Sequence, residues 1–193
     1  VNIQKDRLRF RKNILRIGEV IAYEISKTLR FRPENIETSL GTKSSSVFAE
    51  QPVICSVLRA GLPFQLGLLE FFDRADAAFI SAYRRHTSET EFVIVVEYLA
   101  SPNLNERLLI LADPMLATGH SLVATYNALL KNGTPGRVIV AGLIASEAGL
   151  NYVREQLPHA DIFLADCDPD LNEHAYIVPG LGDAGDLAFG EKL

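Results

Sequence analysis

The 193-residue sequence has no tryptophan, one methionine and only two cysteines, Cys55 and Cys167. Two cysteines cannot build a disulfide framework, and both lie in apolar, strand-like stretches where we expect them to be buried. No apolar run approaches the roughly 18–20 residues that span a bilayer. The net charge of −5 argues against a dedicated nucleic-acid binder, which would present a basic face. No repeat, low-complexity tract or linker divides the chain.

The composition is that of a folded globular protein, with 48% hydrophobic and 22% charged residues. This apolar content is too high, and the charge too balanced, for a disordered chain. The length predicts a single domain over residues 1–193. The first ten residues are polar and basic and contain no apolar leader, so we expect a cytoplasmic protein.

Apolar stretches alternate with helix-like segments along most of the chain. Isoleucines at three- and four-residue spacing predict a helix over 7–29. Residues 33–51 are polar and predict a loop with at most a short strand. Because strands that are apolar throughout are typical of parallel sheets buried on both faces, we expect a doubly wound α/β fold with a mostly parallel sheet flanked by helices. The expected strands are 53–58, 77–83, 92–99, 108–112, 137–145 and 161–165, and the further helices are 63–72, 120–132 and 147–156.

The segment LLILADPMLATGHS, residues 108–121, carries the clearest chemical pattern. Asp113 directly follows an expected strand, and ligands of open α/β sheets bind beyond the carboxyl ends of strands. Thr118, Gly119 and Ser121 lead into a helix N-terminus, where free N–H groups favour an anion. An acid suited to sugar hydroxyls beside a phosphate site describes a ribose 5-phosphate site. The alternative is that Asp113 and the hydroxyl residues only cap the helix.

Arginines follow two other expected strands. Arg59 precedes Ala60-Gly61 at the end of the first sheet strand, and Arg84 belongs to the Tyr83-Arg84-Arg85 run after the next. One guanidinium group can donate two hydrogen bonds to the oxygens of a phosphate, so these positions suit a second, highly charged anion. Each arginine alone could equally be a solvated surface residue. Residues 87–95 are a candidate arm over the site or a dimer contact.

The C-terminal stretch differs from the rest of the chain, because four of the 13 glycines fall in its last 14 residues. Such a cluster either allows positive φ or lets a ligand approach the backbone closely. We expect this stretch to form a loop whose N–H and C=O groups bind a small planar heterocycle. His174 lies near it, but a single histidine without an evident partner is more often structural than catalytic.

At these positions the sequence resembles the uracil phosphoribosyltransferases, within the type I phosphoribosyltransferase superfamily. The resemblance covers nearly the whole chain from about residue 7. It includes VLRAG at 57–61, Tyr83-Arg84, DPMLATG at 113–119 and NEHAYIVPGLGDAGD at 172–186. The broader superfamily usually has acids where this chain has Pro114 and Ala117. That difference and the GLGDAGD tail are typical of the uracil enzymes.

The resemblance implies the reaction of uracil with 5-phosphoribosyl 1-pyrophosphate (PRPP) to give UMP and pyrophosphate, with Mg²⁺. It implies Asp113, Arg84 and Asp183 as catalytic residues and backbone contacts to uracil from Ile177, Gly182 and Ala184, with Asp183 at the junction of the two substrates. No direct metal ligand is implied, because PRPP itself would hold most of the Mg²⁺. The implied PRPP-binding residues are Arg59, Arg84, Asp113, Pro114, Met115, Leu116, Ala117, Thr118, Gly119, His120, Ser121 and Asp183.

One departure from the family pattern and two alternatives remain. The family loop commonly ends TGGS, whereas here His120 replaces the second glycine, so a need for positive φ at that position is in question. One alternative is a nucleotide-binding regulator of RNA, which the acidic charge disfavours. The other is the same reaction on a different base, such as hypoxanthine, which the tail disfavours. We expect uracil and PRPP as the partners, no nucleic acid or membrane, and a homodimer or higher homo-oligomer.

Overall fold

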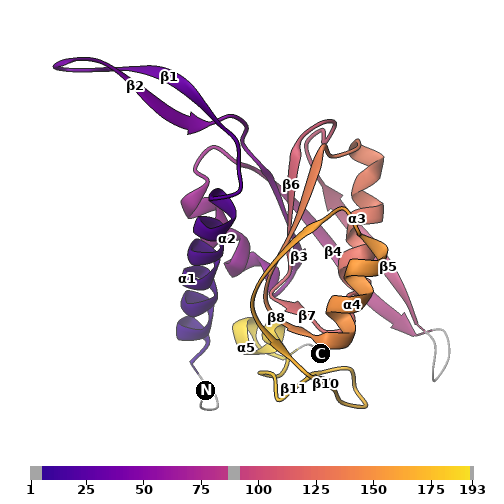
Figure 1. Ribbon diagram of the computed structural model, residues 1–193. Coiled ribbons are helices and arrows are strands. Elements are labelled where there is room, and N and C mark those ends of the chain that lie inside the picture. The colour runs from indigo at the N-terminus through magenta and orange to yellow at the C-terminus, as the bar shows by residue number, and fades with distance from the viewer. Residues whose placement is uncertain (1–5, 87–91, 192–193) are drawn as a thin grey trace.

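A computed structural model describes residues 6–86 and 92–191, with side chains throughout these ranges except between 82 and 96. A central sheet is covered by helices on both faces (Figure 1). The helices are α1 (Arg7–Ser26), α2 (Gly61–Phe71), α3 (His120–Leu129), which continues into a 3-10 turn (Leu130–Asn132), α4 (Glu147–Gln156) and α5 (Ala184–Phe189). The sheet strands are β3 (Val53–Leu58), β4 (Asp76–His86), β5 (Phe92–Ala100), β6 (Leu108–Ala112), β7 (Met115–Leu116), β8 (Arg137–Ser146) and β9 (Asp161–Asp168).

The strand order is β5-β4-β3-β6-β8, and both β7 and β9 pair with β8. All of these neighbours run parallel except β5, which is antiparallel to β4 at the edge. The prediction of a doubly wound, mostly parallel sheet is therefore confirmed. Of the expected arm over 87–95, residues 92–95 lie in β5, and 87–91 lie outside the described residues.

Consecutive strand residues supply two separate cores. Ile54, Ile110 and Ile139 pack on the face covered by α1 and α2. Their neighbours Val53 and Cys55, with equivalent residues of β6 and β8, pack on the face covered by α3 and α4. Because alternate side chains point to opposite faces of a strand, burial on both faces requires the continuous apolar runs seen in the sequence.

Helix α1 packs closely on α2. Asp6 caps its N-terminus by accepting a hydrogen bond from the Arg9 N–H at 3.0 Å. A Cβ at Gly67 of α2 would lie 2.0 Å from the Leu15 carbonyl oxygen, so glycine is needed for the two backbones to approach. The helix ends three residues before the predicted boundary. In the part of the chain that the structure describes, no helix is both long and apolar enough to cross a membrane.

The loop prediction for residues 33–51 is wrong. This stretch forms an antiparallel hairpin of β1 (Phe31–Thr38) and β2 (Gly41–Phe48), which projects from the body of the molecule (Figure 1). Most of its side chains are exposed on both faces, so the sequence shows no apolar alternation there. The prediction that both cysteines are buried is half wrong, because Cys55 is buried but Cys167, near the end of β9, is exposed.

Candidate active site

The expected ligand-binding position lies beyond the carboxyl ends of the neighbouring strands β3 and β6. From β3 the chain adds β4 on one side and then crosses back to add β6 on the other side. Ser56 pairs with Ala112, so Arg59 and Asp113 leave the sheet at the same edge, where β3 and β6 end. Ligands of doubly wound sheets bind at such a switch point, outside the carboxyl ends of the strands.

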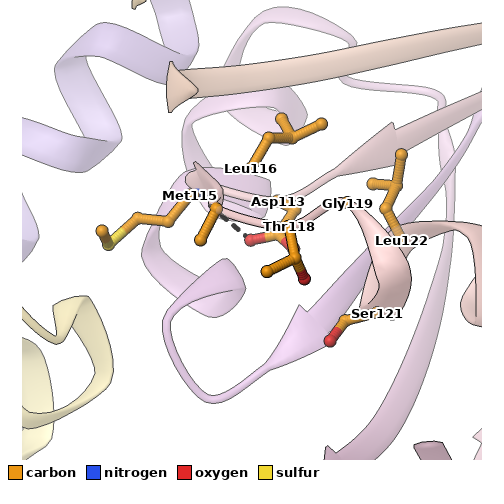
Figure 2. Close-up of a pocket in the computed structure, with 8 residues that line it drawn as sticks. Asp113, Met115, Leu116, Thr118, Gly119, Ser121 and Leu122 are labelled. Carbon is orange, nitrogen blue, oxygen red and sulfur yellow. Dashed lines mark hydrogen bonds between the residues drawn. The ribbon is translucent and has the colours of Figure 1, made fainter. Parts of the chain in front are cut away.

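A small pocket lies just beyond β6 (Figure 2). The hydroxyl side chains of Thr118 and Ser121 lie on the same side as the Asp113 carboxylate, whereas Leu116 and Leu122 point away from them (Figure 2). This side of the pocket therefore offers an acceptor for sugar hydroxyls and two hydroxyl donors for phosphate oxygens. Its lining residues are Asp113, Met115, Leu116, Ala117, Thr118, Gly119, Ser121 and Leu122.

Asp113 is a carboxyl group with little access to water. Burial raises its pKa to about 6, and a hydrogen bond that its Oδ1 accepts from the Met115 N–H at 3.1 Å lowers the pKa by a smaller amount. The group is thus mostly ionised at neutral pH although it lies in a poorly solvated place. Perturbed carboxyl groups of this kind cluster at functional sites.

The N-terminus of α3 opens onto the same pocket. Its N-cap is Gly119, at φ +75°, which makes no side-chain capping bond. A Cβ at this position would lie 2.9 Å from the Gly149 carbonyl oxygen, so both the backbone angle and the space require glycine. The alternative that Asp113 caps this helix does not hold, because Asp113 instead accepts a bond from Met115. The N–H groups at a helix start whose N-cap residue carries no side chain are suited to bind an anion.

The side chain of His120 is directed to α4 and not to the pocket. Its imidazole stacks on the Tyr152 ring with centroids 4.2 Å apart. His120 is not among the residues with positive φ, which settles the question raised by the TGHS variant: the left-handed residue is the preceding Gly119. A side chain is therefore tolerated at position 120.

His120→Gly is expected to weaken the fold more than the binding of substrate. The change removes a ring stack and adds a flexible residue to the first turn of α3, which should lower the free energy of unfolding by about 1–2 kcal/mol. Urea unfolding measures this loss. A KM for PRPP that stays within about threefold of wild type would agree with an imidazole outside the pocket, and a tenfold rise would contradict it.

The middle of the 113–121 segment is built into the sheet. Residues 115–116 form β7 beside β8, and the Pro114 carbonyl accepts hydrogen bonds from the Leu143 and Ile144 N–H groups at 3.2 and 3.1 Å. Leu116 is fully buried. Pro114 and Leu116 therefore fix the loop's path rather than presenting side chains to a ligand.

Two residues outside the predicted site hold the loop from behind. Ser146, at the end of β8, donates to the Ala117 carbonyl at 2.6 Å and accepts from the Gly149 N–H at 2.9 Å. A Cβ at Gly149 would lie only 2.3 Å from the Ala117 carbonyl oxygen. Ser146 is the N-cap of α4, and nothing local in the sequence shows that its hydroxyl also contacts the loop.

The structure describes the side chain of Arg59 but only the backbone of Arg84. Arg59 extends from the end of β3 to the C-terminal segment, where its Nη2 donates to Asp186 Oδ1 at 2.7 Å and its Nη1 to the Gly190 carbonyl at 3.0 Å. Arg84 lies in β4, opposite Ile94 of β5, but its side chain lies outside the described side chains. Its role in the site remains a prediction.

The C-terminal segment contains two short strands, β10 (Asp170–Leu171) and β11 (Ile177–Val178), and then α5, none of which the sequence predicted. Asp183 is the N-cap of α5 and accepts a hydrogen bond from the Asp186 N–H at 2.9 Å. Gly182, at φ +89°, lines a pocket together with Asp183 and Asp186. Ile177 and Ala184 are buried on either side of this loop, and His174 is exposed beside Glu173.

Metal-binding groups are sparse in the site. Asp113 is the one carboxylate among the residues that line the pocket beyond β6. Within residues 6–86 and 92–191, no cluster of three or more His, Cys, Asp or Glu side chains could hold a metal ion. A single carboxylate fits a divalent ion whose other ligands come mostly from a bound phosphate compound.

Comparison with known proteins identifies the family. A family model described as "Uracil phosphoribosyltransferase" matches residues 2–191. A uracil phosphoribosyltransferase from Porphyromonas gingivalis is 50% identical over 194 residues, covering 100% of this chain and 90% of that protein. The chain belongs to the uracil phosphoribosyltransferase family. A uracil phosphoribosyltransferase from Methanothermobacter thermautotrophicus is 39% identical, over 96% of this chain and 85% of its own length.

Solved structures share the fold of this member of the uracil phosphoribosyltransferase family. A protein from Aquifex aeolicus superposes with a TM-score of 0.88 at 31% identity, covering 96% of this chain and 88% of its own. A hypoxanthine phosphoribosyltransferase from Staphylococcus aureus has a TM-score of 0.55 at 14% identity, covering 83% of this chain and 76% of its own, which shows a shared fold only. The expected phosphoribosyltransferase fold and the resemblance found in the sequence are both confirmed.

Proposed function

We propose that this protein transfers the 5-phosphoribosyl group of PRPP to uracil, producing UMP and pyrophosphate. The bond from ribose C1 to the pyrophosphate oxygen breaks, a bond from C1 to uracil N1 forms, and the N1 proton is released. The observation that carries the proposal is the pairing of Asp113 with the open N-terminus of α3 at the switch point, in a member of the uracil phosphoribosyltransferase family.

The pocket beyond β6 supports a role in holding ribose 5-phosphate. The Asp113 carboxylate accepts hydrogen bonds from ribose hydroxyls, because an ionised carboxyl is a pure acceptor. The α3 N–H groups and the Thr118 and Ser121 hydroxyls bind the 5-phosphate. Binding energy from this phosphate, which does not react, then serves to orient C1 for attack.

The arginines are assigned to the pyrophosphate, which gains negative charge as the C1 bond breaks. Arg59 at the end of β3 and Arg84 in β4 stabilise that charge, and no covalent nucleophile is required. Mg²⁺, held mainly by PRPP oxygens with Asp113 as the carboxylate of the pocket, would neutralise part of the same charge.

The C-terminal loop is assigned to the base. Ile177, Gly182 and Ala184 present backbone groups to the edge of uracil, and Asp183 lies where base and PRPP meet. The left-handed Gly182 and the space beside it support a backbone-lined site, because no side chain obstructs the approach of a planar ring. Hypoxanthine is the competing substrate to test, because its purine ring is larger than uracil and would need more space beside this loop.

A direct assay decides the function. Purified protein is incubated with uracil, PRPP and Mg²⁺, and UMP is measured by chromatography, with hypoxanthine and cytosine in parallel reactions. UMP formation that requires PRPP and is stopped by a chelator supports the proposal. Nucleotide formation from hypoxanthine but not uracil would overturn the choice of base, and salt-dependent RNA binding without UMP formation would overturn the enzyme assignment. Light scattering of the same sample tests the proposed homodimer or higher homo-oligomer.

Arg84→Ala is expected to raise the KM for PRPP or lower kcat by about tenfold or more, through loss of a charge-assisted contact of roughly 1.5–3 kcal/mol. Steady-state kinetics with PRPP varied at saturating uracil measure the change. Arg74→Ala removes an exposed arginine that precedes β4 and serves as the control. Equal kinetics for the Arg84 and Arg74 variants would remove Arg84 from the site.

A further inference from the structure

One guanidinium connects the end of β3 to the C-terminal helix. Arg59 is assigned to PRPP, yet its Nη2 bonds Asp186 Oδ1 at 2.7 Å and its Nη1 bonds the Gly190 carbonyl at 3.0 Å. The two contacts hold the guanidinium against both the first turn and the C-terminal end of α5. Asp186 itself is not among the residues assigned to either substrate.

The contact is built into the fold and is not a loose surface pair. The side chains of Arg59 and Asp186 are each about one-third exposed, at 33% and 34%. A Cβ on Gly185 would lie 3.4 Å from the Arg59 Nη2, so the guanidinium passes closely over the start of α5. The Arg59 Nε is buried and has no hydrogen-bond partner among the described atoms. In such a partly desolvated place a charged hydrogen bond is stronger than at the surface.

The helix that holds Arg59 begins within the loop assigned to uracil, because Asp183 is its N-cap and Ala184 its first residue. Asp183 caps α5 through the Asp186 N–H, so the two acids occupy one helical turn. Gly182, Asp183 and Asp186 line a common pocket. Asp186 thus contacts Arg59 through its side chain and Asp183 through its backbone N–H.

We propose that Asp186 is a positioning residue, which sets the Arg59 guanidinium for pyrophosphate and ties the uracil loop to it. The proposal rests on the function proposed above. With Asp186 in place, part of the ordering of Arg59 precedes PRPP binding, and bound PRPP in turn fixes the loop that receives uracil. Because coupling between two binding sites is reciprocal, each substrate then favours the other.

An inhibitory role for Asp186 would change the KM for PRPP in the opposite direction. If the ion pair instead held Arg59 away from PRPP, the carboxylate would compete with pyrophosphate for the guanidinium. Weakening the pair would then lower the KM for PRPP. A purely structural role in the first turn of α5 would change stability, and any change in PRPP affinity would then be the same in the presence or absence of the Arg59 guanidinium.

Asp186→Asn is the deciding variant, because it keeps the shape and the backbone cap while removing the charge. We expect the KM for PRPP to rise about tenfold with kcat changed less than about threefold, and the stimulation of uracil binding by PRPP to fall. Calorimetry with PRPP and Mg²⁺ measures binding directly. Asp76→Asn is the matched control, since it removes the charge from the Arg107–Asp76 pair, 2.6 Å long. This pair lies where β4 and β6 begin, at the opposite ends of the strands from the site.

A double-mutant cycle assigns the effect to Arg59. In the Arg59→Lys background, Asp186→Asn should change PRPP affinity by less than about twofold, because the residue acts through the guanidinium. Full additivity, a lowered KM, or an unchanged KM in Asp186→Asn would each overturn the proposal. The proposed function fails separately, through absence of UMP formation by the wild-type protein, and calorimetry with PRPP still tests Asp186 in that case.

Discussion

Asp113→Asn is expected to fold normally yet to lose UMP formation, with kcat/KM for PRPP lowered by at least about a hundredfold. The carboxylate offers acceptors only, and an amide replaces one of its oxygens with a donor that faces the ribose hydroxyls. Losing two charge-assisted hydrogen bonds of roughly 1.5–3 kcal/mol each accounts for this factor. The remaining amide oxygen can still accept from the Met115 N–H, so the loop keeps its local bond. Steady-state kinetics with PRPP varied measure the loss.

The same substitution should stabilise the fold at neutral pH. Burial raises the Asp113 pKa from 3.8 to about 6, so above pH 6 the folded chain carries a poorly solvated charge that the unfolded chain solvates freely. That penalty amounts to at most about 3 kcal/mol, less what partial exposure returns, and it disappears as the pH falls below 3.8. Asp113→Asn should therefore exceed wild type in unfolding free energy at pH 7, and the difference should shrink towards pH 4.5.

Comparison with Asp73→Asn, an exposed acid before β4, isolates the effect of burial. This control should retain activity and show no comparable pH-dependent gain in stability. Full activity in Asp113→Asn would mean that Asp113 only fixes the loop, by accepting a hydrogen bond from the Met115 N–H. A loss of stability at pH 7 would mean that the charge is held by partners inside the folded chain, contrary to the raised pKa.

The sequence predicted those parts of the fold in which local pattern and tertiary environment agree. Strands buried on both faces must be apolar throughout, so β3, β6 and β8 were predicted to within one residue at each end. The β1–β2 hairpin was missed because both of its faces are exposed and its polar residues carry no burial pattern. Helix α5 was missed because six residues are too few to show a periodicity.

The site was predictable to the extent that its residues follow strand ends. The position of Asp113 after β6 and of the hydroxyl residues before α3 can be read locally, and the structure gathers them in one pocket. Contacts between segments distant in sequence could not be read in this way. The bond from Ser146 to Ala117 spans 29 residues, and that from Arg59 to Asp186 spans 127. Such contacts depend on how β8, α4 and α5 are placed.

Gly149→Ala should therefore impair PRPP binding although the residue touches no proposed substrate atom. The new methyl would lie 2.3 Å from the Ala117 carbonyl oxygen and 2.6 Å from that of Leu116, both of which are backbone atoms in the loop that carries Asp113 and Thr118. The loop must move, and displacements of about 1 Å at a reacting site can cost a hundredfold in rate. We expect at least a tenfold rise in the KM for PRPP and about 1–3 kcal/mol lower stability, as for other overpacked sites.

Gly67→Ala provides the contrast that separates loop displacement from general destabilisation. Its methyl would lie 2.0 Å from the Leu15 carbonyl, so it strains the α1–α2 contact as severely but leaves the PRPP loop in place. It should lower the melting temperature with a nearly normal KM, and Asn151→Ala, at an exposed position of α4, should change neither. If both glycine variants raise the KM in proportion to their loss of stability, the loop is not held by α4. A raised KM in Gly149→Ala alone would mean that the geometry of the phosphate site depends on the absence of a single carbon atom behind it.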